Sequence, residues 1–179
     1  MEHQLSLFKH TTSSTTIKKK DPPPPKKIVH SHQWKLFIDG ASRGNPGPSG
    51  AGIYVTYNDT EKIKKGIFLG TRTNNQAEYL ALALGLFFLK DKLKETDTVV
   101  ITSDSELLVQ QMKGVYKIKD KTLQQLKRLI DTFLENITCT FEHVLRINNK
   151  KADVLANEGI DKKTHAPKAF LELLSLYTS

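Results

Sequence analysis

The most constraining feature of this sequence is the stretch 34–47, where a short apolar run is followed by one carboxylate and then by a turn rich in glycine and proline. The apolar residues Leu36 to Ile38 are typical of a strand that is covered on both faces. Asp39 follows them directly, at a place where an ionised carboxylate is costly unless it has a partner. An aspartate that opens a turn is also a common local device, because its side chain accepts backbone hydrogen bonds. Asp39 alone therefore leaves both interpretations open.

The pattern of elements after Trp34 predicts an α/β fold. Runs of strand-forming residues between turn signals predict five strands, at 34–39, 51–57, 61–70, 98–101 and 138–145. Apolar positions at the helical period predict four helices, at 75–90, 105–113, 122–134 and 150–160. We expect the first three strands to form an antiparallel meander and the later strands to alternate with helices. This order predicts a mixed sheet with helices packed against it.

The sequence divides into an N-terminal extension at 1–33, a folded domain at 34–161 and a C-terminal tail at 162–179 that can form a helix. Within the extension, residues 9–33 contain lysine and proline runs and few large apolar groups, so we expect a disordered linker with a stiff polyproline segment. The extension holds six lysines and two acidic residues. Its net charge is therefore +4, which is half of the net charge of +8 of the whole chain. A basic chain favours a polyanionic partner, although its lysines also serve solubility.

Several classes of protein are not expected from this composition. No apolar run approaches the roughly 20 residues of a membrane span, and the first 20 residues lack the apolar core of a secretory signal. We therefore expect a cytoplasmic protein with no membrane partner. We also expect a monomer. The single cysteine, Cys139, has no Cys or His cluster around it and is interpreted as a small core residue.

Three further acids stand at the ends of predicted elements. Glu78 lies in the first turn of the helix at 75–90, Asp104 follows the fourth strand, and Asp153 lies in the first turn of the last helix. Each has a local explanation: Asn75-x-x-Glu78 resembles a capping box, Asp104 can cap a helix, and Asp153 suits a helix dipole.

The four acids together suggest chemistry. If the strand ends before Asp39 and Asp104 lie side by side, the carboxylates form a cluster that repels itself without cations. Hard divalent ions take oxygen ligands, and a pair of them about 4 Å apart can support phosphodiester cleavage. A metal-dependent reaction on a polyanion is therefore the sharper hypothesis.

Four segments of this chain resemble type 1 ribonuclease H, in the family's order and over most of residues 34–161. They are residues 39–47, 73–79, 102–105 and 149–157. The resemblance implies a ribonuclease H-like fold, with a five-stranded mixed sheet of three antiparallel and then two parallel strands. It also implies two Mg²⁺ or Mn²⁺ ions held by Asp39, Glu78, Asp104 and Asp153. Such a site would cut the RNA strand of an RNA–DNA hybrid by in-line attack of a metal-bound water, leaving 5′-phosphate and 3′-hydroxyl ends.

The resemblance also places substrate contacts. Asn45, Thr73, Asn74 and Asn75 lie where the family contacts the minor groove of the hybrid. An amide there can engage a 2′-hydroxyl, the group that distinguishes RNA from DNA. Local roles stay open, because Asn45 precedes a proline in a turn and Asn74 or Asn75 can cap the following helix.

The chain departs from the family pattern in two places. Many members carry a histidine on the loop before the last aspartate that is thought to aid product release, whereas here that loop offers Arg146, as in some relatives. We expect Arg146 to act in catalysis through phosphate or product handling, and we interpret His143, inside the fifth predicted strand, as structural. The stretch from Gly114 to Thr122 holds three lysines but has no room for the extra basic helix that some members use to grip substrate.

Two rival functions share this fold. A catalytically silent hybrid-binding module is expected to lack one of the acids, yet all four are present. A DNA nuclease of the same fold would share the four acids, and it is the asparagine-rich segment at 73–75 that favours hybrids.

The extension begins with a short amphipathic peptide that resembles the bacterial β sliding clamp-binding motif. It consists of Gln4, Leu5, Ser6, Leu7 and Phe8. Large apolar residues ahead of a linker need a partner, which the clamp would supply; the alternatives are that they fold back onto the domain or match the motif by chance.

Overall fold

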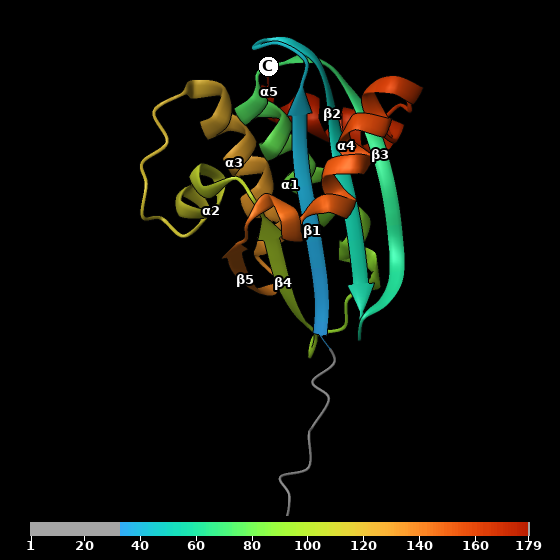
Figure 1. Ribbon diagram of the computed structural model, residues 1–179. Coiled ribbons are helices and arrows are strands. Elements are labelled where there is room, and N and C mark those ends of the chain that lie inside the picture. Colours follow the sequence, from blue (N-terminus) through green and yellow to red (C-terminus); the bar gives the residue numbers. More distant parts are fainter. Residues whose placement is uncertain (1–32, 179) are drawn as a thin grey trace, which may run out of the picture.

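A computed structural model describes residues 33–178 of the chain (Figure 1). The predicted clamp-binding residues 4–8 lie outside the described residues. The strands are β1 (Gln33–Ser42), β2 (Gly47–Tyr57), β3 (Thr60–Arg72), β4 (Thr98–Ser103) and β5 (Thr138–His143). The α-helices are α1 (Asn74–Leu89), α2 (Glu106–Met112), α3 (Lys121–Leu134), α4 (Lys150–Lys162) and α5 (Lys168–Thr178). Two short 3₁₀ turns, η1 (Lys90–Lys92) and η2 (Arg146–Asn148), complete the described elements.

The five strands form one mixed sheet in the order β3-β2-β1-β4-β5. The first three strands pair antiparallel, while β4 pairs parallel with β1 and β5 parallel with β4. The predicted fold class and the antiparallel meander are therefore confirmed. The prediction that β1 ends at Asp39 is wrong, because pairing with β2 carries β1 on to Ser42.

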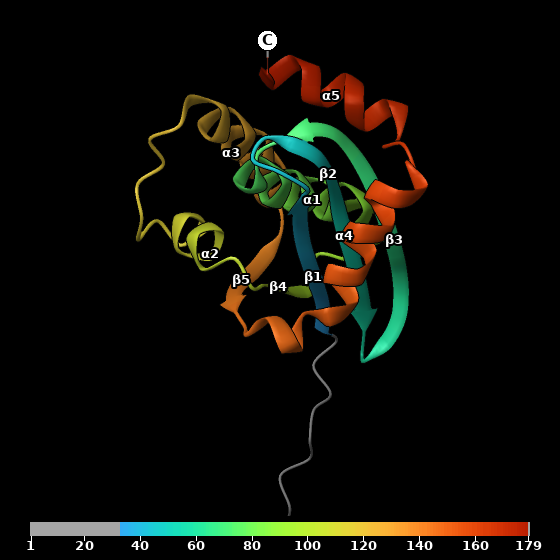
Figure 2. The same ribbon diagram turned by 45° about the horizontal axis from the view of Figure 1, so that its top comes forward.

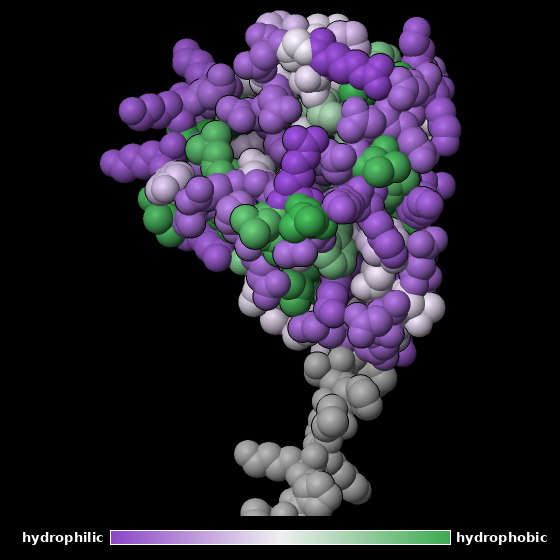
Figure 3. Space-filling view, viewed as in Figure 1, coloured by the Kyte–Doolittle hydropathy of each residue, from purple (hydrophilic) through white to green (hydrophobic). Residues whose placement is uncertain are grey.

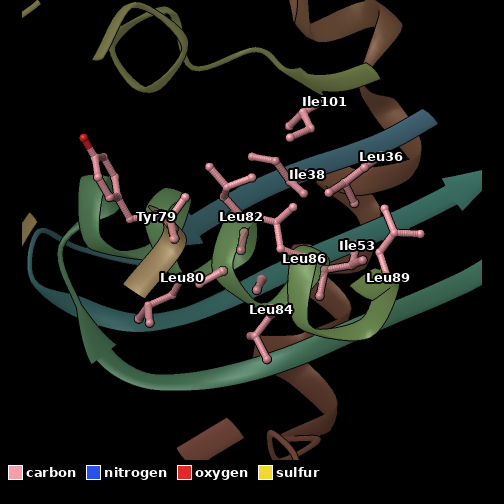
Figure 4. Close-up of a cluster of buried hydrophobic side chains, with 14 of the residues drawn as sticks. Leu36, Ile38, Ile53, Tyr79, Leu80, Leu82, Leu84, Leu86, Leu89 and Ile101 are labelled. Carbon is pink, nitrogen blue, oxygen red and sulfur yellow. The ribbon is translucent and has the colours of Figure 1, made fainter. Parts of the chain in front are cut away.

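Helices cover the two faces of the sheet in different ways (Figure 1). The long helix α1 packs on one face against β1 and β2, with α3 behind it, and α4 lies on the opposite face over β2 and β3. The core lies mainly between α1 and the sheet, where leucines of the helix meet Leu36, Ile38 and Ile53 of the strands (Figure 4). Burial of this apolar interface is the main stabilising contribution to the domain, at about 25 cal/mol per Å² of apolar surface.

The start of α1 is fixed by a capping box. The Thr73 hydroxyl accepts the backbone N–H of Gln76, and the Gln76 side chain accepts the backbone N–H of Thr73. The capping explanation offered for Asn75 and Glu78 is therefore wrong. Because Thr73 and Gln76 satisfy the helix end, the Glu78 carboxylate does not serve as a cap.

Glycines let α4 lie unusually close to the sheet. A Cβ atom on Gly52 would lie 1.9 Å from the backbone oxygen of Ala152, and one on Gly66 would lie 2.3 Å from that of Leu155. Only glycine leaves room for this approach, since real Cβ contacts are never so short. The contact sets the position of the first turn of α4, which carries Asp153.

The chain continues past residue 161 into α5, which packs beside α3. Figure 2 shows α5 over the end of the molecule that α1 and α3 share. Phe170 is buried, and its ring centroid lies 5.5 Å from that of Phe87 of α1. Across residues 33–178, the helices are all too short or too polar to span a bilayer.

Candidate active site

Asp39 and Asp104 meet where β1 and β4 separate. The two strands pair in register only as far as Phe37 and Thr102. Each acid lies two residues beyond that last pair, and side chains two apart on a strand share a face. The negative charge of Asp104 is among the causes that raise the pKa of Asp39, as expected for two carboxyl groups that lie close together. Asp39 is 6% exposed.

Glu78 reaches the same place from α1. Its Oε2 accepts the backbone N–H of Gly40 at 3.1 Å, and its side chain is buried. A Cβ atom on Gly40 would lie 2.1 Å from the backbone nitrogen of Glu78, so the strand and the helix touch through their backbones. The glycine after Asp39 therefore allows the first turn of α1 to bring Glu78 beside Asp39.

Asp153 comes from the opposite face, in the first turn of α4. Its carboxylate forms an ion pair with the guanidinium of Arg146, which belongs to η2. The Arg146 side chain is 76% exposed, whereas that of Asp153 is 25% exposed. Arg146 also acts on Asp39 and Glu78, because its charge lowers the pKa of both carboxyl groups.

The pKa of Asp39 shows that these acids share one electrostatic environment. Burial is the largest cause that raises this pKa from 3.8 to about 7. The negative charges of Asp104 and Asp153 raise it further. A shift in this direction marks a carboxyl group that has lost water and gained like charges as neighbours.

Glu78 responds in the same direction. Burial first, and then the charges of Asp39 and Asp104, raise the pKa of Glu78 well above its usual range. The hydrogen bond from Gly40 opposes this rise and does not cancel it. Two buried acids with raised pKa values, facing two further acids, are typical of a functional site.

Asn149 belongs to this cluster, and sequence reasoning assigned it no role. It lies in the segment 149–157, but an asparagine at a helix start is expected to be a cap. Its buried Nδ2 instead donates hydrogen bonds to the Ile38 carbonyl oxygen at 2.9 Å and to Asp104 Oδ1 at 2.8 Å. Its place four residues before Asp153 was the available signal.

The four acids have the chemistry that binds a divalent cation, although they are not already arranged as a complete coordination site. Among residues 33–178, no three His, Cys, Asp or Glu side chains are already arranged as a metal-binding group. Arg146 engages Asp153, and Asn149 engages Asp104. The donors are all oxygens, and the cluster holds more negative charge than Arg146 alone neutralises. Mg²⁺ and Mn²⁺ prefer such donors.

The residues expected to contact substrate form a second group beside the acids. Asn45 Oδ1 accepts the backbone N–H of Asn74 at 2.9 Å, which ties the turn after β1 to the start of α1. Thr73 is the N-cap of α1, and Asn74 and Asn75 are exposed in its first turn. The alternative in which Asn74 or Asn75 caps α1 is therefore wrong.

Two other regions lie near the site. His143 ends β5, pairs in register with Ser103 and is exposed. The chain between α2 and α3 has no helical segment, in agreement with the expected lack of an extra basic helix. The face that carries α4 is largely hydrophilic, with separate hydrophobic patches near its centre (Figure 3).

The amino-acid sequence of this chain is similar to those of known proteins. Residues 31–161 match the family model described as RNase H. Ribonuclease HI of Halobacterium salinarum is 36% identical over 129 residues, covering 70% of this chain and 63% of the relative. Ribonuclease HI of Pseudomonas putida is 32% identical over 148 residues, covering 72% of this chain and 93% of the relative.

A solved structure agrees with the fold. The crystal structure of LC11-RNase H1 in complex with RNA/DNA hybrid has a TM-score of 0.69 and 39% identity, covering 72% of this chain and 97% of that one. The chain spans less than two thirds of some curated relatives, including 36% of a bifunctional protein of Mycobacterium tuberculosis.

The electrostatics of the cluster predict that Asp39→Asn stabilises the metal-free protein near pH 7. Folding raises the pKa of Asp39, so the folded protein holds this proton more tightly than the unfolded chain does. The contribution of Asp39 to the stability of the fold is therefore complete below pH 4, where both states are protonated, and is lost as the pH rises to about 7. One pKa unit corresponds to about 1.4 kcal/mol, so we expect Asn to recover a few kcal/mol.

The measurement is the melting temperature in EDTA from pH 4 to pH 8 for both proteins. The advantage of the variant should be absent at pH 4 and grow towards pH 7. A variant that melts at or below the wild-type temperature at pH 7–8 would show that folding does not raise the pKa of Asp39.

Proposed function

Because the chain belongs to the ribonuclease H family, we propose that it is an endoribonuclease that cleaves the RNA strand of RNA–DNA hybrids by a two-metal-ion mechanism. The observation that carries this proposal is the convergence of four acids from separate elements. Asp39 comes from β1, Glu78 from α1, Asp104 from the end of β4 and Asp153 from α4. Structural roles do not account for such a cluster, since each buried carboxylate weakens the fold.

The proposed cofactors are two Mg²⁺ or Mn²⁺ ions held by these four carboxylates. When bound, the ions supply activation of water and stabilisation of the leaving oxygen in an in-line displacement. Asp39 and Glu78 are both buried, and the Gly40 N–H also donates a hydrogen bond to Glu78. The side-chain amide of Asn149 donates to Asp104. Products with 5′-phosphate and 3′-hydroxyl ends are expected from this reaction.

Recognition of RNA is assigned to the second group of residues. The Asn45 carbonyl oxygen is already used by the backbone of Asn74, which leaves the amide NH₂ group of Asn45 as a donor at the surface. Asn74 and Asn75 present further amides in the first turn of α1, next to Thr73. Amide groups beside the acids can read the 2′-hydroxyl of the strand to be cut. The hybrid bound to LC11-RNase H1 supports this choice of substrate.

This function predicts cleavage of a labelled RNA–DNA hybrid in Mg²⁺ or Mn²⁺ and none in EDTA. Asp39→Asn should abolish turnover, because the amide keeps the shape but not the charge that the ions need. Double-stranded RNA and double-stranded DNA serve as control substrates, and a melting curve shows that the variant is folded. Hybrid binding without cleavage would instead support a silent binding module, and preferential cutting of DNA would support a DNA nuclease.

A separate prediction concerns Arg146, whose guanidinium is exposed beside Asp153. Arg146→Ala should lower turnover by roughly a hundredfold, because a cation that faces phosphate or product is lost. Metal binding should persist. Arg128→Ala, an exposed arginine on α3, is the matched control. Wild-type kinetics in the Arg146 variant would make this residue an ordinary surface cation.

We further propose that residues 4–8 bind the bacterial β sliding clamp, which would keep the nuclease in the cytoplasm beside nascent DNA. The support is the match of all five residues to the motif. As a flexible chain, the segment 9–33 would reach roughly 25–30 Å. Tethering typically gives effective concentrations of about millimolar, which would offset the absent basic helix.

Binding of the full-length protein to purified β clamp tests this partner. The wild type should bind at micromolar concentration, and a Leu7→Ala/Phe8→Ala double variant should not, because the motif loses its apolar anchors. The proposal is ruled out by no binding at tens of micromolar, or by equal binding of the double variant.

A further inference from the structure

Asn149 joins the elements that carry three of the acids. Its backbone oxygen accepts the N–H of Asp153 at 3.1 Å, and its backbone N–H donates to the carbonyl oxygen of Arg146 at 3.0 Å. Its side chain bonds Asp104 and the carbonyl of Ile38, the residue before Asp39. One residue therefore lies in contact with β1, with the end of β4 and with both partners of the ion pair.

The side chain of Asn149 does not perform the usual task of an asparagine at this position. An N-cap side chain normally accepts a backbone N–H from the first turn, yet this one makes no capping bond to α4. It is 1% exposed and turned towards the acids. Its Oδ1 is buried with no hydrogen-bond partner among the described residues. An unpaired buried oxygen lowers stability, so the stability of the fold does not by itself explain this orientation of the Asn149 amide.

The orientation of the amide follows from its neighbours. Both atoms beside Nδ2, the Ile38 carbonyl oxygen and Asp104 Oδ1, are acceptors. Turning the amide over would set its oxygen against two other oxygens. The NH₂ group must therefore face Asp104, which forms no salt bridge within residues 33–178.

We propose that Asn149 is a positioning residue that fixes the Asp104 carboxylate against the end of β1 and thereby sets its spacing from Asp39. This inference rests on the proposed metal-dependent function. A neutral donor suits the task, because a lysine or arginine there would compete with the metal ions for Asp104. Partners that orient metal-binding carboxylates typically contribute tenfold to a hundredfold to metal affinity or activity.

The test compares Asn149→Ala and Asn149→Asp with Asn148→Ala in the full-length protein. Asn148 is an exposed neighbour whose side chain forms no hydrogen bond to any of residues 33–178, so it is the matched control. Calorimetric titration with Mn²⁺ in the absence of substrate measures affinity. Hybrid cleavage then gives kcat and KM, and melting curves in EDTA report folding.

We expect Asn149→Ala to weaken Mn²⁺ binding tenfold to a hundredfold and to lower kcat, with partial recovery at high Mn²⁺ and KM for the hybrid within about twofold. Asn149→Asp keeps the shape but turns an oxygen towards Asp104 and the Ile38 carbonyl, so it should be no better than alanine. Asn148→Ala should match the wild type.

Three outcomes would overturn the proposal. The first is wild-type Mn²⁺ affinity in Asn149→Ala, which would leave the residue a merely structural role. The second is full function in Asn149→Asp. The third is loss of folding in both variants, because a positioning residue is dispensable for the core. If the wild type binds Mn²⁺ but does not cut hybrids, the proposed function fails, while the affinities still decide the role of Asn149.

Discussion

Repulsion between buried carboxylates is the constraint on which the rest of this structure depends. Folding removes Asp39 and Glu78 from water and places them beside Asp104, so both pKa values rise. Nothing in the local sequence favours that arrangement, and it must be offset elsewhere. The apolar interface between α1 and the sheet supplies the compensation, since most of α1 is buried there. The helix that contributes most to the core is also the helix that carries Glu78.

The acids meet because backbones approach one another where side chains would prevent it. Gly40 lets β1 touch the first turn of α1, and Gly52 lets α4 lie on the sheet. The separation of β1 from β4 after Phe37 then leaves room for Asp39 and Asp104. These features set the spacing between backbones. A substitution at one of these glycines would therefore displace a carboxylate that the substituted residue does not itself contact.

Much of this fold could be predicted from the sequence, because apolar periodicity determines which segments are strands and helices. The ends of elements were harder: β1 runs past Asp39 because β2 pairs with it to Ser42, a tertiary effect that no local pattern shows. The capping box at Thr73 was missed because Asn75 and Glu78 have a similar spacing. Asn149 was missed for a related reason, since the hydrogen bonds of its side chain go to Ile38 and Asp104, which are distant in the chain.

The most direct test of this account is calorimetric titration of the wild-type protein with Mn²⁺ near pH 6.5, without substrate, in two buffers of different ionisation heat. Metal ligands must be deprotonated, so ions that enter the cluster should displace protons from Asp39 and Glu78. We expect saturable binding, with a heat that differs between the two buffers and shows proton release. Absence of saturable binding at millimolar Mn²⁺, or binding with equal heats in both buffers, would contradict it.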